Sequence, residues 1–168
     1  MNSVIVLKTV ISTTSVENVA NYLINQKSKT IAICNVNTLV RSYKNSTIQN
    51  KINSFDIKAP DGFPVAKSSK ILYKNQQDRV DGFNVFHKTI ENGINEGLTH
   101  YFYGSDPKVV DLMIENLKLI YPEIKIAGVY CPPIKTYKEL AEEKYVKDLI
   151  DKNADVVWVS LGFPKQEE

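Results

Sequence analysis

The stretch Phe55-Asp56-Ile57-Lys58-Ala59-Pro60-Asp61-Gly62-Phe63-Pro64 decides how the chain is interpreted. Residues 55–58 predict a short strand, and the Pro-Asp-Gly sequence after it predicts a tight turn. Such a turn holds the Asp61 carboxylate at the edge of a sheet, where it faces a cleft. Because Asp-Gly is also a common surface turn, the stretch alone leaves a catalytic carboxylate and an ordinary turn open.

Strands and helices alternate along the rest of the chain. Short apolar segments predict strands at 30–34, 98–103, 124–130 and 155–160. Helical patterns lie at 16–23, 37–53 (in one piece or two), from the Asp61 turn through residue 71, and at 81–95, 107–117 and 137–150. This alternation is typical of an α/β, Rossmann-like fold, with a largely parallel sheet and helices on both faces. We expect residues 1–168 to form a single domain.

The composition argues against several classes of protein. With 168 residues, 43% hydrophobic content and a net charge of +2, the chain suits one globular core and gives no case for nucleic-acid binding or a polybasic anchor. Cys34 and Cys131 form no C-x-x-C pair, so we expect both to behave as small hydrophobes in a reducing compartment, and we expect no zinc site. The apolar run at 4–7 is too short for a signal peptide or a membrane span, which favours a cytoplasmic protein.

Ligands of parallel α/β sheets bind beyond the carboxyl ends of the strands. In this chain those positions hold most of the polar, glycine and proline residues, at 35–37, 60–62, 104–106, 131–133 and 161–166. Because functional loops are built from such segments, we expect the site there.

Two of these segments suit phosphate or nucleotide. Gly104-Ser105-Asp106-Pro107 starts a helix after a strand, where free backbone N–H groups favour an anion, although an ordinary capped helix is the alternative. In the loop at 162–166, Lys165 can meet phosphate and Gln166 can bond a base or sugar, the alternative being a loop that enters a solvated helix. Because G-x-G-x-x-G and P-loop motifs are absent, a dinucleotide oxidoreductase is disfavoured, and without an Asp-x-Asp pair we expect no metal or other cofactor.

Arg79 is a further candidate, since its forked donors can clamp a phosphate or a sugar substituent. A surface ion pair with Asp78 or Asp81 is the alternative. His87 and His100 are interpreted as structural, because no Ser or Cys nucleophile pattern accompanies them.

Five segments, in order and in approximate spacing, resemble the WecG/TagA/CpsF glycosyltransferase family (glycosyltransferase family 26). They are Asn35-Val36-Asn37, Ala59-Pro60-Asp61-Gly62, Arg79-Val80-Asp81-Gly82-Phe83-Asn84, Tyr121-Pro122-Glu123-Ile124-Lys125-Ile126-Ala127-Gly128 and Leu161-Gly162-Phe163-Pro164-Lys165-Gln166-Glu167. The similarity runs from about Val4 to the last residue, and the Pro-Asp-Gly turn and the Gly-x-Pro-Lys-Gln-Glu ending are its specific parts.

The resemblance implies a transferase for cell-surface polysaccharides such as teichoic acid or capsule. It moves a hexosamine-type sugar, N-acetylmannosamine or its uronic acid or another hexose, from a UDP-sugar to a polyprenyl-diphosphate-linked acceptor. The reaction is inverting and metal-independent, with Asp61 as general base. Asn37, Arg79 and Gln166 match the family's strand-end asparagine, pocket arginine and nucleotide-side glutamine. The expected substrate-binding set is completed by Asn35, Gly104, Ser105, Gly162 and Lys165.

The sequence also departs from the family pattern. Asn84 stands where the family usually has Asp, and residues 36–39 lack the usual Pro-Asn-Ala-Glu. Family members continue into a basic C-terminal tail that contacts the inner face of the bacterial membrane, and we expect a chain ending at Glu168 to lack it. The sequence leaves open whether the protein forms a homo-oligomer. The alternative function is that of a non-catalytic nucleotide- or sugar-binding module.

Overall fold

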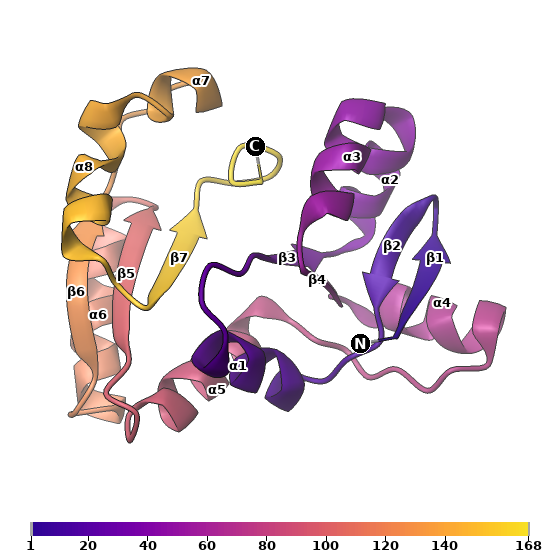
Figure 1. The fold of residues 1–168 in the computed structure, drawn as a ribbon, viewed down its shortest axis with the longest axis horizontal. Helices are drawn as coiled ribbons and strands as arrows, with labels where there is room; N and C mark the ends of the chain where they lie inside the picture. The colour runs from indigo at the N-terminus through magenta and orange to yellow at the C-terminus, as the bar shows by residue number, and fades with distance from the viewer. Residues whose placement is uncertain (1, 168) are drawn as a thin grey trace. The chain divides into compact units, whose positions relative to one another are not determined.

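A computed structural model describes residues 2–167. The chain forms two compact units, one of residues up to Thr89 together with Glu167 and one of residues 90–166. In chain order the elements are β1 (Ser3–Val6), β2 (Thr9–Ser12), α1 (Val16–Asn25), β3 (Ile31–Cys34), α2 (Val36–Lys44), α3 (Ser46–Ser54), β4 (Ile57–Pro60), α4 (Phe63–Tyr73), α5 (Gly82–Gly93), β5 (Thr99–Gly104), α6 (Pro107–Ile120), β6 (Lys125–Tyr130), α7 (Tyr137–Leu140), α8 (Glu143–Lys152) and β7 (Val156–Ser160) (Figure 1).

The α/β architecture with parallel strands and flanking helices is the one that the sequence predicted. In the first unit β3 pairs with β4 in parallel, and Cys34 lies opposite Pro60. In the second unit β5 is the central strand, with β6 and β7 parallel on its two sides. The strands from β3 to β7 are thus divided between two parallel sheets, and each sheet brings the carboxyl ends of neighbouring strands to one edge.

An antiparallel hairpin at the amino terminus was not predicted from the sequence. β1 pairs with β2 from Ser3 opposite Ser12 to Val6 opposite Thr9. The connecting residues Leu7 and Lys8 both have positive φ, at 48° and 62°, as a two-residue hairpin turn requires. Neither is the Asn or Gly that usually marks such a turn, so the pattern carried no local signal.

The core of the first unit packs α1 and α5 against the β3–β4 pair. Ser15 caps α1 as predicted, with its side chain accepting from the Asn18 N–H at 3.2 Å. The apolar stripe of α1 then meets the strands. The buried members of this cluster are Val19, Ile57, Ala59, Val80 and Val85.

Two segments expected to be helical are each broken into two helices. Asn45 ends α2 and begins α3, because its side-chain oxygen accepts from the N–H groups of Thr47 and Ile48. In the second unit, α7 begins at a capping box formed by Thr136 and Glu139. The hydrogen bonds from Thr136 lower the pKa of Glu139 to about 2.

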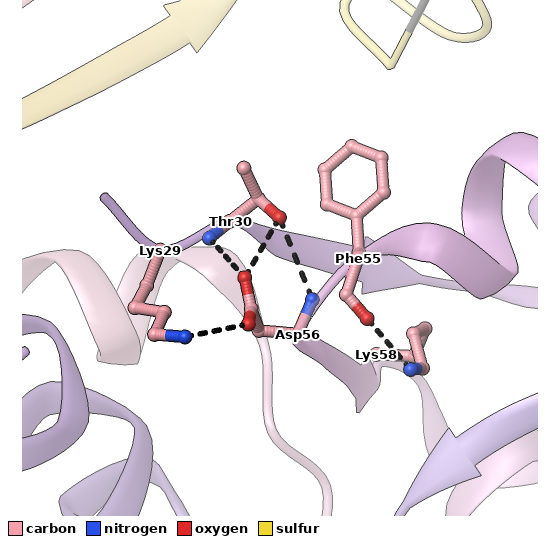
Figure 2. A network of polar contacts seen from close by, with 5 residues as sticks. All are labelled: Lys29, Thr30, Phe55, Asp56 and Lys58. Atoms are coloured by element: carbon pink, nitrogen blue, oxygen red, sulfur yellow. Dashed lines mark hydrogen bonds and ion pairs between the residues drawn. The ribbon is translucent and has the colours of Figure 1, made fainter. Parts of the chain in front are cut away.

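The same hydrogen-bonded pair lies at the amino-terminal edge of each parallel sheet. In each pair an aspartate before one strand accepts from the backbone N–H and the hydroxyl of a threonine at the start of the adjacent strand, and we call this pair a Thr–Asp clip. Asp56 accepts from the backbone N–H of Thr30 at 2.9 Å and from its hydroxyl at 3.1 Å, and Lys29 adds an ion pair at 3.2 Å (Figure 2). Asp155 accepts from the backbone N–H of Thr99 at 2.9 Å and from its hydroxyl at 2.7 Å. Each clip joins the starts of two adjacent strands.

β5 is the most buried strand of the second unit. It carries His100, whose buried position and contact with Trp158 confirm that this histidine has a structural role. The indole N–H of Trp158 donates to Nδ1 of His100 at 3.2 Å, and burial lowers the pKa of His100 to about 4. The imidazole is therefore neutral at physiological pH. On the other face, the Tyr101 hydroxyl donates to Asp148 of α8 at 2.7 Å. Gly128 leaves room for the Tyr101 ring, since a Cβ there would lie 2.6 Å from a ring carbon.

Candidate functional site

Asp61 lies directly after the last residue of β4, at the carboxyl edge of the first unit's parallel pair. Its backbone N–H donates to the Cys34 carbonyl at 2.9 Å, which ties the turn to the end of β3. The Pro60 carbonyl accepts from the Val80 N–H, also at 2.9 Å. Pro60 thus belongs to the strand and not to the turn, and the turn itself uses Gly62, whose φ is 81°. The backbone fixes Asp61 from one side and brings residue 80 to it from the other.

Val80 brings Arg79 and Asp81 to the same edge. The Arg79 Nε lies 3.2 Å from Asp61 Oδ1 and 3.6 Å from Asp81 Oδ2. The side chain of Asp61 is 22% exposed and that of Arg79 is 58% exposed. The ion pair with Asp81 that the sequence allowed is therefore present, and a second one with Asp61 joins it. One guanidinium bridges two carboxylates and stays accessible to solvent.

Asp81 is the member of this group that the expected site residues omit. Its carboxylate accepts from the Asn84 backbone N–H at 3.1 Å and from the Asn84 side-chain amide at 2.7 Å. Burial opposes the charged form of Asp81, but these hydrogen bonds and the nearby Arg79 outweigh it and lower its pKa. The spacing D-x-x-N before an apolar helix is a capping signal that would have found it. The asparagine at position 84 suits a charged Asp81, because its amide donates a hydrogen bond to the Asp81 carboxylate, whereas an aspartate at position 84 would repel that carboxylate.

The two candidate asparagines lie at the neighbouring strand end. Asn35 caps α2, since its side-chain oxygen accepts from the Thr38 N–H at 3.1 Å and from the Thr38 hydroxyl at 3.3 Å. Asn37 is exposed in the first turn of the same helix. A capping role thus accounts for the oxygen of Asn35, and substrate binding by either residue stays a prediction.

The structure brings the other candidates together at the carboxyl edge of the second unit. Gly104 of β5 pairs with Ser160 of β7, so the loops after both strands start side by side. Gly104 has a φ of 114° and lies against the Ser160 backbone, so a Cβ would collide with it. The backbone N–H of Ser105 donates to the Ser160 carbonyl at 2.9 Å, so it is already used within the sheet; anion binding at this helix start stays a prediction. Asp106 caps α6 through the Lys108 N–H at 2.9 Å, as predicted.

The loop after β7 is closed by its own residues. Gln166 accepts from the Gly162 N–H through its side-chain oxygen at 3.1 Å, and its backbone N–H donates back to the Gly162 carbonyl at 3.2 Å. Lys165 is half-buried in this loop. The side-chain oxygen of Gln166 therefore shapes the loop, and contacts of this glutamine with a base or sugar stay a prediction.

Other reactive groups in the described chain are few. Burial raises the pKa of the Cys34 thiol to about 12, so this cysteine stays protonated and packs as a small apolar residue, as expected. Within residues 2–167, no three His, Cys, Asp or Glu side chains are grouped to hold a metal ion. In the same residues no helix combines the length and the apolar character needed to cross a bilayer.

Comparison with known proteins assigns the family. The model of the glycosyl transferase WecG/TagA/CpsF family matches residues 4–168. The chain belongs to this family. That assignment confirms the resemblance seen in the five sequence segments, from the strand-end asparagines to the Gly-x-Pro-Lys-Gln-Glu ending.

Several curated proteins are similar over most of this chain. One from Bacillus spizizenii, named N-acetylglucosaminyldiphosphoundecaprenol N-acetyl-beta-D-mannosaminyltransferase, is 29% identical over 146 residues, which are 87% of this chain and 55% of that protein. Relatives of the same name from Bacillus subtilis and Staphylococcus aureus are 25% and 26% identical, over 93% and 91% of this chain. The chain spans somewhat more than half the length of these relatives, 55–59%.

Proposed function

We propose that this chain carries the catalytic residue of a glycosyltransferase for bacterial cell-surface polysaccharide. By analogy with the names of the relatives, the transferred sugar is N-acetylmannosamine or a related hexose, and the acceptor is N-acetylglucosamine on a polyprenyl diphosphate. The proposed donor is the UDP-activated form of that sugar. The observation that carries the proposal is the position of Asp61. In a member of this family, the backbone N–H of Asp61 donates to the Cys34 carbonyl at a strand end, and Arg79 pairs with the partly exposed Asp61 carboxylate.

The proposed reaction is a direct displacement with inversion. Asp61 takes the proton of the acceptor hydroxyl, the hydroxyl oxygen forms the new bond to the anomeric carbon, and the bond from that carbon to UDP breaks on the opposite side. A positioned general base contributes about 10²–10⁴-fold to such a step. The remaining acceleration comes from orientation of the two substrates and from stabilising the charge on the departing diphosphate.

Arg79 has a proposed role in binding beside the base. Its guanidinium is more than half exposed, so an anionic or hydroxyl-bearing substrate group can reach it. Asp61 and Asp81 hold the Nε, which limits the orientations of the side chain. A guanidinium already oriented loses less freedom when substrate binds.

The nucleotide is proposed to use the carboxyl edge of the second unit. The loops that begin at Gly104 and Gly162 line this edge, and Lys165 supplies a positive charge. Under this proposal protein groups neutralise the leaving diphosphate and the reaction is independent of divalent metal. Because the acceptor is lipid-linked, we also propose that the protein works at the inner face of the cell membrane.

The test is a transfer assay on the protein as its gene encodes it. A panel of UDP-sugars is incubated with lipid-diphosphate-linked N-acetylglucosamine, with and without EDTA, for the wild type, Asp61→Asn and the matched control Asp78→Asn. We expect transfer that survives EDTA, a loss of about 10²-fold or more in Asp61→Asn and near wild-type rates in Asp78→Asn. Wild-type turnover in Asp61→Asn would remove the base from the mechanism. UDP binding without any turnover would favour a non-catalytic module.

A further inference from the structure

Helix α4 directs a mixed apolar and basic face toward solvent. Val65, Ala66 and Ser69 are buried on its inner side. On the outer side lies a stripe with the spacing of one helix face, which continues into the residue that ends the helix. We call it the α4 face, and its members are Phe63, Lys67, Lys70, Ile71 and Lys74.

The apolar members of the α4 face are exposed to solvent. Phe63 is 69% exposed and Ile71 is 68% exposed. At the carboxyl end of the helix the Tyr73 hydroxyl donates to the Ile5 carbonyl at 2.7 Å, which fixes α4 beside β1 (Figure 1). Ile5 is itself exposed, so the apolar surface extends onto the hairpin. A rigid surface of this kind is typical of an interaction site.

Charge distinguishes α4 from α6, which is another helix that exposes large apolar residues. Helix α6 exposes Leu112 and Leu119, but its sequence carries Asp111 and Glu115 as well as two lysines. Residues 62–77, by contrast, contain three lysines and no acidic residue. The α4 face is therefore locally cationic although the whole chain has a net charge of only +2. Its partner should be both anionic and apolar.

An anionic lipid surface satisfies both requirements, and a second copy of this chain does not. In a two-fold contact between identical α4 faces, each lysine would face the lysines of the other copy. At a membrane, the lysine stems can lie along apolar surface while their ammonium groups reach lipid phosphates. The Lys67 Nζ lies over the Phe63 ring, 5.2 Å from its centroid, so a positive charge and an exposed apolar ring are adjacent on this face.

We propose that the α4 face rests on an anionic membrane. Phe63 and Ile71 enter the boundary between headgroups and acyl chains, and Lys67, Lys70 and Lys74 contact lipid phosphates. Helix α4 begins two residues after Asp61, a chain length of roughly 7 Å, so the carboxylate stays near that surface. This link to a lipid-linked acceptor rests on the proposed function, whereas membrane binding by the α4 face does not.

The experiment is flotation of the 168-residue chain with two kinds of vesicle, one of phosphatidylcholine and one of phosphatidylcholine mixed with phosphatidylglycerol. The charge variant is Lys67→Gln/Lys70→Gln, and its matched control on α6 is Lys108→Gln/Lys118→Gln. The apolar variant is Phe63→Ser/Ile71→Ser, and its control is Leu112→Ser/Leu119→Ser. Circular dichroism checks that each variant keeps the wild-type fold.

We expect the wild type to float with the anionic vesicles and to be released by high salt. Both α4 variants should bind roughly tenfold more weakly or worse, while both α6 controls bind like the wild type. Failure of the wild type to bind anionic vesicles, or equal binding by the α4 variants, would overturn the proposal. Sedimentation equilibrium tests the alternative that a second copy of the chain binds the α4 face. A wild-type dimer that dissociates in the α4 variants would also overturn the membrane proposal. Because this readout needs no turnover, it is independent of the test of Asp61.

Discussion

Asp61 and Arg79 form an ion pair, with the carboxylate Oδ1 3.2 Å from the guanidinium Nε, although 18 residues separate them in the sequence. The pair exists because the Val80 N–H bonds to the Pro60 carbonyl and so returns the chain to the end of β4. It places a carboxylate and a cation at one strand end, and the following expectations test this edge and the elements that support it.

Replacing Arg79 by lysine should impair transfer more than stability. A lysine keeps the charge, but a single ammonium group cannot reproduce the planar fork of a guanidinium that lies near both Asp61 and Asp81. We expect transfer to fall by about tenfold or more, through binding or rate, and the free energy of unfolding to change by less than about 1 kcal/mol, because the side chain is largely exposed. Steady-state kinetics and urea unfolding measure the two effects. The matched control is Arg41→Lys on α2, which should leave transfer unchanged; equal effects of the two substitutions would contradict the assignment.

The Thr–Asp clip of the first unit should make stability depend on pH in the acid range. The hydrogen bond from the Thr30 backbone, with Lys29 adding to it, lowers the pKa of Asp56 in the folded protein. The charged form therefore stabilises the fold above the ordinary aspartate pKa, near 3.9, and this contribution is lost as the pH falls through the lower folded value. We expect Asp56→Ala to destabilise the protein by about 1 kcal/mol at pH 7, and by less at the acid end. Urea unfolding of the wild type and of Asp56→Ala, between pH 7 and pH 3, measures this loss of stability. If the two free energies of unfolding differ by the same amount at every pH, the electrostatic explanation is refuted.

Two glycines with positive φ should differ in their tolerance of alanine. A Cβ at Gly104 would collide with the Ser160 backbone, whereas a Cβ at Gly162 would meet no atom within 4 Å. Gly162→Ala should therefore cost only the backbone strain, about 1 kcal/mol, and Gly104→Ala should cost about 3 kcal/mol because the sheet edge must also move. Thermal unfolding of both variants measures the contrast. Equal losses would show that the close approach of β7 to Gly104 is not a constraint.

Nucleotide binding should perturb the carboxyl edge of the second unit. If UDP uses the loops after β5 and β7, its titration should shift the amide resonances of Gly104, Ser105, Gly162 and Gln166 in NMR spectra. The amides of Thr99 and Asp155, at the opposite edge of the same sheet, provide the internal control. Shifts confined to those control amides would exclude the proposed nucleotide position.

Much of the fold could be predicted because near neighbours in the sequence decide it. The side chains of Ser15 and Asp106 cap their helices by accepting from backbone N–H groups two or three residues further along the chain, and the apolar spacing of each strand and helix is a local property. The Asp61 turn was found for the same reason, since Asp-Gly is a local turn signal and Gly62 supplies the positive φ that the turn uses. Where the local signal was weak, as at Leu7 and Lys8, the prediction missed the hairpin.

The sequence by itself determined the alternation of strands and helices, the caps, the strand-end loops and the motifs that resemble the family. Only the tertiary structure decided which groups in those loops are already engaged. The Ser105 N–H is used by Ser160 across the sheet, and Arg79 is shared by Asp61 and Asp81. These partners depend on strand pairing and on the path of the chain after α4. Such long-range contacts arise only when the burial of residues such as Val80 fixes the packing, and no local pattern encodes that event.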